Sequence, residues 1–69
     1  MDKIFTTRFK ELRKEKGFTQ KELAEILKTT DDSIYSWESG RSQPSIEMIR
    51  SICKTLSISS DYLLGIEED

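Results

Sequence analysis

The 69-residue chain carries 11 basic and 13 acidic side chains, a net charge of −2, and its length allows one small domain. It has no histidine and one cysteine, which excludes a His-based catalytic triad, a His metal ligand and an internal disulfide. It has neither an apolar run long enough to span a membrane nor a signal-peptide core, so we expect a cytoplasmic, non-enzymatic protein without metal or cofactor.

The first two predicted helices are separated by a glycine. Residues 5–16 carry apolar side chains at helical spacing, and Gly17 is typical of a helix end. A second helix opens at Thr19, because Glu22 three residues later can complete a capping box. The buried stripe of this helix is then formed by Leu23, Ala24 and Leu27.

The third predicted helix has an acidic first turn. Thr30 is a good N-cap, and Gly40 ends the pattern. Asp31 and Asp32 follow the cap, where the helix dipole favours negative charge. The inward-facing residues of this helix are Ile34 and Trp37.

Serine caps predict the last two helices. Ser45 opens the fourth, and Ser59 or Ser60 opens a short fifth helix that Gly65 closes. Ile66 could fold back as the hydrophobic contact of that helix end. The apolar face of the fourth helix comprises Ile46, Ile49, Ile52, Cys53 and Leu56.

We therefore predict one all-α, five-helix domain over residues 1–69, with a flexible acidic tail at 66–69. Residues 19–38 are the unit that suggests a function, because two capped helices joined by a short turn form a helix-turn-helix. The second helix of such a unit enters the major groove of DNA. Residues 1–28 hold eight basic and five acidic side chains, which points modestly to a polyanion. The lysines of this half are interpreted as a solvated face: Lys10, Lys14, Lys16 and Lys21.

Three stretches carry a wider resemblance: FKELRKEKGFTQKELAEIL, TTDDSIYSWESGRSQPS and LSISSDYLLG. They resemble the Cro and lambda-repressor-like helix-turn-helix family of prokaryotic and phage regulators, of the xenobiotic-response-element type. The likeness runs from about residue 8 to residue 65. It implies a compact lambda-repressor-like domain and a sequence-specific DNA-binding regulator of transcription, a repressor on a two-fold operator.

The resemblance also implies roles for single residues. Gln20 corresponds to a residue that bonds a DNA phosphate. The recognition-helix positions that meet base edges or nearby phosphates are Thr30, Asp31, Asp32, Tyr35 and Ser36. The loop positions that lie on the DNA backbone are Arg41, Ser42 and Gln43. Arg13 and Glu38 match a partly buried ion pair that ties the first helix to the third.

Two positions depart from the family pattern. Lys28 stands where glycine is usual, and a left-handed backbone there would cost about 1 kcal/mol. Asp31 and Asp32 stand where many relatives carry Gln, Arg, Ser or Lys, and carboxylates repel phosphates. This acidic start keeps open an alternative, a protein-interaction module on the same fold such as an antitoxin or anti-repressor partner.

The expected partner is double-stranded DNA. A homodimer is expected, because a single recognition helix reads few bases. The candidate residues for the dimer surface are Tyr62, Leu63 and Ile66, although a core of this size could also bury them.

Overall fold

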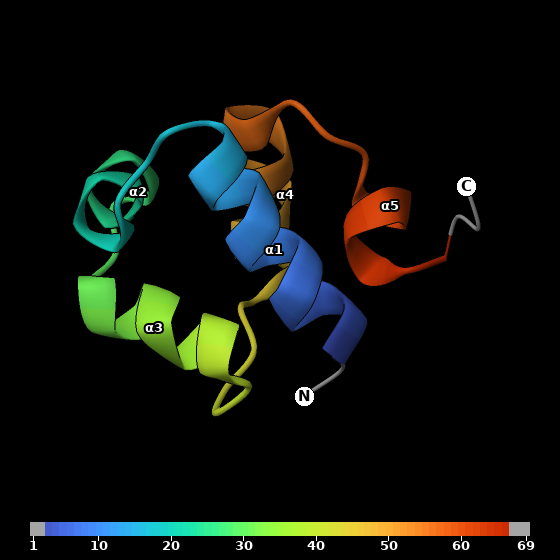
Figure 1. Ribbon diagram of the computed structural model, residues 1–69, viewed down its shortest axis with the longest axis horizontal. Coiled ribbons are helices and arrows are strands. Elements are labelled where there is room, and N and C mark those ends of the chain that lie inside the picture. The colour runs from blue at the N-terminus through green and yellow to red at the C-terminus, as the bar shows by residue number, and fades with distance from the viewer. Residues whose placement is uncertain (1–2, 67–69) are drawn as a thin grey trace.

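The computed structural model describes residues 3–66, and within them five helices pack around one core (Figure 1). In chain order they are α1 (Lys3–Glu15), α2 (Gln20–Leu27), α3 (Asp31–Ser39), α4 (Ile46–Leu56) and α5 (Ser60–Leu64). Helix α1 crosses the middle of the view, with α2 and α3 on one side and α5 on the other. The all-α prediction is confirmed, since the described part contains no strand. None of its helices has the length and apolar character needed to cross a membrane.

Side-chain caps determine where four of these helices begin. The Thr19 hydroxyl accepts from the Glu22 N–H at 3.0 Å, and the Glu22 carboxylate accepts from the Thr19 N–H at 2.9 Å, which is the predicted capping box. Equivalent hydroxyl caps, each at 3.1 Å, are made by Thr30, Ser45 and Ser59. Ser59 rather than Ser60 is therefore the cap of α5. Each cap contributes about 1 kcal/mol.

Helix α2 ends on a residue in the left-handed conformation. Lys28 has φ 59°, and its N–H donates to the carbonyl of Glu25 at 3.2 Å. The next N–H, of Thr29, donates to the carbonyl of Ala24 at 2.9 Å, which closes the helix as a glycine would. Ser57 ends α4 in the same way with φ 56°, and the sequence analysis missed it.

We expect Lys28→Gly to raise the free energy of unfolding by about 0.5–1 kcal/mol. Glycine relieves left-handed backbone strain of about 1–2 kcal/mol. Its greater conformational entropy in the unfolded chain offsets part of this stabilisation. Chemical denaturation of the variant measures the difference, with Ser57→Gly as a second site of the same geometry. A clear loss of stability at both sites would contradict this account of the two helix ends.

Aromatic side chains in the core pack α1 against α3. Phe9 is fully buried, and its ring lies 5.4 Å from that of Phe5 and 6.2 Å from that of Trp37, so it connects α1 with α3. Trp37 is 7% exposed, which confirms its predicted core position. Cys53 is half-buried against this core, and burial raises the pKa of its thiol. The complete set of buried apolar residues is Phe5, Phe9, Leu23, Ala24, Leu27, Ile34, Trp37, Ile52, Leu56 and Leu63.

Two expectations for the C-terminal segment are wrong. Leu63 is 0% exposed, so it belongs to the core and cannot form a dimer surface. The Ile66 side chain is 68% exposed, so it does not fold back onto α5. Ile66 contributes to the end of α5 through its backbone rather than its side chain, because its N–H donates to the carbonyl of Asp61 at 2.9 Å. Residues 67–69 of the predicted tail lie outside the described residues.

Candidate nucleic-acid interface

Helices α2 and α3 form the predicted helix-turn-helix. Helix α2 ends at Leu27 and α3 begins at Asp31, so residues 28–30 form the short turn between them. Ala24 is 3% exposed and Ile34 is 0% exposed, so both face the interior, and the small side chain of Ala24 permits close packing. Helix α3 runs along an edge of the molecule with its outer side open (Figure 1). An exposed helix at an edge is the geometry that a major groove can accept.

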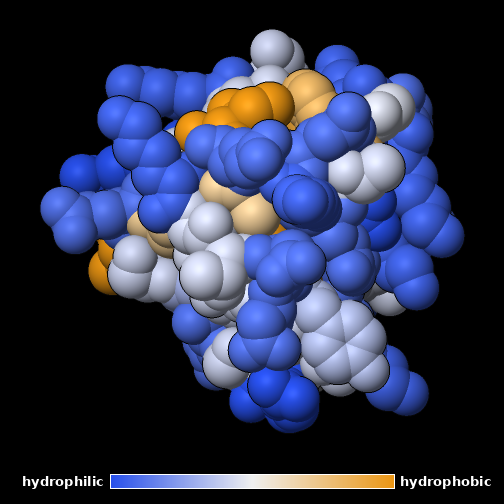
Figure 2. Space-filling model, turned by 90° about the vertical axis from the view of Figure 1, so that its left-hand side faces the viewer, coloured by the Kyte–Doolittle hydropathy of each residue, from blue (hydrophilic) through white to orange (hydrophobic). Residues whose placement is uncertain are grey.

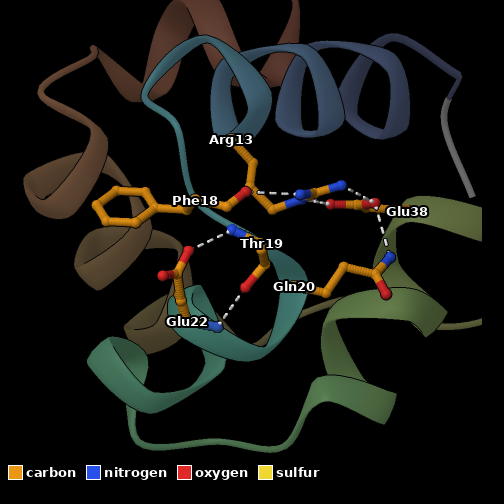
Figure 3. A network of polar contacts seen from close by, with 6 residues as sticks. All are labelled: Arg13, Phe18, Thr19, Gln20, Glu22 and Glu38. Carbon is orange, nitrogen blue, oxygen red and sulfur yellow. Dashed lines mark hydrogen bonds and ion pairs between the residues drawn. The ribbon is translucent and has the colours of Figure 1, made fainter.

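A buried ion pair fixes α3 against α1 (Figure 3). The Arg13 Nε donates to Glu38 Oε2 at 2.6 Å, and Nη2 donates to Oε1 at 3.2 Å. The two side chains are only 8% and 4% exposed. Arg13 Nη1 also donates to the carbonyl of Phe18 at 2.7 Å, in the segment before α2. The structure thus brings the two predicted partners together and joins three segments through one guanidinium.

Gln20 is the third side chain of this network. Its amide Nε2 donates to Glu38 Oε1 at 3.1 Å, a contact that the sequence analysis did not foresee. The amide oxygen points away from Glu38 (Figure 3). A primary amide has two N–H donors, so one N–H can orient the side chain while the other serves a second acceptor. Gln20 is therefore held in place at the start of α2, where backbone N–H groups also favour an anion.

A hollow of about 240 Å³ lies beside Gln20, between the helix-turn-helix and α1. Lys10 contributes a positive charge from α1, and Tyr35 contributes a phenol from α3. Lys10 is exposed, as expected for the solvated face of lysines, and it also borders this hollow. Lys10 stands three residues before Arg13, so the two residues lie on the same side of α1. The complete lining is Lys10, Gln20, Tyr35, Glu38 and Ser39.

The outer side of α3, defined here by Asp31, Asp32 and Tyr35, is open to solvent, and Tyr35 is 51% exposed. Thr30 is exposed as well, and its hydroxyl accepts the capping hydrogen bond of α3. Figure 2 views the α2 and α3 side and shows a largely hydrophilic surface with scattered apolar side chains. The outer side of α3 therefore offers hydroxyl and carboxylate groups rather than an apolar patch.

Ser36 departs from its predicted role. It is only 6% exposed, and its hydroxyl accepts from Arg41 Nη2 at 3.0 Å. We therefore correct its assignment from a direct DNA contact to a support for Arg41.

Arg41 reaches back from the loop over α3. Its Nη2 lies 3.8 Å from Asp32 Oδ2, and its guanidinium carbon lies 6.0 Å from the centre of the Tyr35 ring. The loop residues Ser42 and Gln43 are exposed beside it. The structure thus gathers most of the predicted contact residues on one side of the molecule. Within residues 3–66, no cluster of acidic, His and Cys side chains could hold a metal ion.

Comparison with known proteins gives consistent matches. The helix-turn-helix family model matches residues 9–63. The chain is 39% identical over 64 residues to the HTH-type transcriptional activator BcrR of Enterococcus faecalis, covering 93% of this chain and 31% of BcrR. It is 34% identical over 61 residues to the HTH-type transcriptional regulator ImmR of Bacillus subtilis, covering 88% of this chain and 48% of ImmR. The chain therefore spans about a third to a half of the length of these two relatives.

Solved structures share the arrangement of the helices. The P22 c2 repressor in complex with a synthetic operator superposes with a TM-score of 0.81 at 27% identity, covering 86% of this chain and 89% of that one. The clp gene regulator ClgR of Corynebacterium glutamicum superposes with a TM-score of 0.82 at 28% identity, covering 91% of this chain and 67% of the ClgR chain.

Proposed function

The chain belongs to the Cro/C1-type helix-turn-helix family, and from this membership we infer that it is a non-enzymatic regulator of transcription that binds double-stranded DNA sequence-specifically. The observation that carries the proposal is the open outer side of α3, held rigidly by the buried pair of Arg13 and Glu38. The P22 c2 repressor, a structural neighbour, is described in complex with an operator, which supports DNA as the ligand.

The docking follows from the positions of the side chains. Helix α3 enters the major groove, and Gln20 with the start of α2 lies on a phosphate. Arg41 binds the backbone beyond α3, and Ser42 and Gln43 lie along the same strand. Lys10 adds a further positive charge beside Gln20. These contacts position the protein, and they carry no sequence information themselves.

The acidic start of α3 reads the bases. A carboxylate only accepts hydrogen bonds, so Asp31 and Asp32 reject the acceptor edge of guanine. They accept from the amino group of cytosine or, less typically, of adenine. Tyr35 and Thr30 complete the reading surface. The preferred site therefore carries C or A under the start of α3.

A cytoplasmic homodimer that represses at a two-fold site completes the proposal. Two copies of α3 are needed, because one recognition helix contacts too few base pairs to select an operator. The burial of Leu63 restricts the predicted dimer surface to Tyr62 and Ile66. The similar proteins include both a transcriptional activator and a repressor that is described in complex with an operator.

We expect Gln20→Ala to weaken binding by about ten-fold or more, equally on all duplexes, because a hydrogen bond to a charged group contributes about 1.5–3 kcal/mol. Arg41→Ala should weaken binding to a preferred duplex and lower the slope of its log affinity against log salt by about one. Fluorescence anisotropy with labelled duplexes measures both. Lys54→Ala is the matched control, since it removes one positive charge from the α2–α4 side. A change in the preferred sequence of the Gln20→Ala variant would contradict the assignment of Gln20 to a phosphate.

A second candidate function, binding of a protein partner, is supported by the exposed carboxylates of Asp31 and Asp32. They repel phosphates, which favours a protein partner on this face. Failure of the wild-type protein to bind any duplex at low salt would select this alternative, because binding to DNA strengthens steeply as salt is lowered.

A further inference from the structure

Asp32 and Arg41 form an ion pair on the proposed DNA-binding face. The Asp32 Oδ2 lies 3.8 Å from Arg41 Nη2, and the two side chains are 78% and 64% exposed. The same Nη2 donates to the hydroxyl of Ser36 at 3.0 Å, and Ser36 is 6% exposed. A buried hydroxyl therefore anchors the guanidinium, while a carboxylate from the start of α3 shares it.

The Asp32 carboxylate and a DNA phosphate are chemically similar ligands for Arg41. Both are anionic oxygen acceptors, and a guanidinium binds either of them with charge-assisted hydrogen bonds. The pair is open to solvent, so it changes an equilibrium constant by about five-fold at most. Such a pair holds Arg41 in the free protein, and a better-placed acceptor can displace it.

We propose that Asp32 is a specificity-determining residue that withholds Arg41 from DNA phosphates until a base donates a hydrogen bond to its carboxylate. On a random sequence no base donates a hydrogen bond to the Asp32 carboxylate. The carboxylate therefore stays paired with Arg41 and repels the DNA backbone. On a site with cytosine or adenine at that position, the amino group bonds the carboxylate and Arg41 moves to the adjacent phosphate. Asp32 thereby couples base reading to backbone binding. The inference rests on the proposed function, because it requires DNA on this face.

Asp31 supplies a matched control for the test. It has the same charge and also lies in the first turn of α3, whereas the ion pair to Arg41 is made by Asp32. We expect Asp32→Asn to bind a random duplex about two- to five-fold more tightly than Asp31→Asn does, from the strength of an exposed pair. Fluorescence anisotropy at one fixed low salt concentration measures both, and circular dichroism checks that the helical content is unchanged.

The same comparison in an Arg41→Gln background isolates the coupling. There the two Asn variants should bind a random duplex equally, because the partner of Asp32 is gone. Equal affinities of the two variants with Arg41 present would overturn the inference and leave DNA binding intact. An unchanged advantage of Asp32→Asn in the Arg41→Gln background would also overturn it. If the wild type and every variant fail to bind any duplex at low salt, the proposed function falls together with the inference.

Discussion

Loss of either partner of the ion pair between Arg13 and Glu38 is expected to destabilise the protein by about 3–5 kcal/mol. Both side chains are almost completely shielded from water, so removing one partner leaves the other charge buried without its counter-ion. For a domain with a core this small, such a loss is a large part of the total free energy of unfolding. The effect should therefore be the largest of any polar substitution in the chain.

A double-mutant cycle separates the pair from its surroundings. Urea unfolding of Arg13→Met, Glu38→Gln and the double variant gives the coupling energy, for which we expect about 1–3 kcal/mol. The exposed pair of Asp32 and Arg41 is the control, with an expected coupling below about 1 kcal/mol. A coupling energy near zero for Arg13 and Glu38 would show that their contact does not hold α1 to α3.

The helix starts could be predicted because their signals are local. The Thr19 and Glu22 capping box spans four residues, and its pattern is visible in the sequence itself. The helix ends were harder where no glycine marks them. Ser57 adopts the left-handed conformation without any compositional sign, and only the packed structure shows it.

Contacts between residues that are far apart in the sequence could not be predicted from helical periodicity alone. Arg13 and Glu38 are 25 residues apart, and their pairing was expected from the family resemblance rather than from spacing. Ser36 is buried because the following loop folds back over it, where the N–H groups of Arg41 and Ser42 both donate to its carbonyl at 2.9 and 3.3 Å. Helical periodicity describes one helix and contains no information about a loop that covers it.

The same limit of helical periodicity explains why Leu63 was wrongly predicted to lie on a dimer surface. Helix α5 has five residues, which is little more than one turn, so its pattern does not define which side faces the core. Packing against α1 determines which side chains of α5 are buried. The end of α5 lies so close to α1 that a side chain added at Gly65 would approach Ile4 Cγ2 to 2.7 Å. This close approach of the two helices cannot be read from either segment alone.

The largest functional effect that we expect is the difference between a selected duplex and a random one. The net charge of −2 and the carboxylates on α3 disfavour random DNA, and base contacts determine the difference in affinity between the two duplexes. Regulators that bind in this way commonly prefer their sites by about 1,000-fold or more, which corresponds to about 4 kcal/mol. We expect this protein to reach that ratio as a homodimer.

Selection of bound duplexes from a random pool tests the central claim most directly. We expect a two-fold symmetric motif with half-sites about 10 base pairs apart and with C or A under the start of α3. The enriched duplex should bind about 1,000-fold more tightly than the unselected pool. A pool that remains random after repeated rounds, with no duplex bound even at low salt, would contradict the account and favour a protein partner for this face.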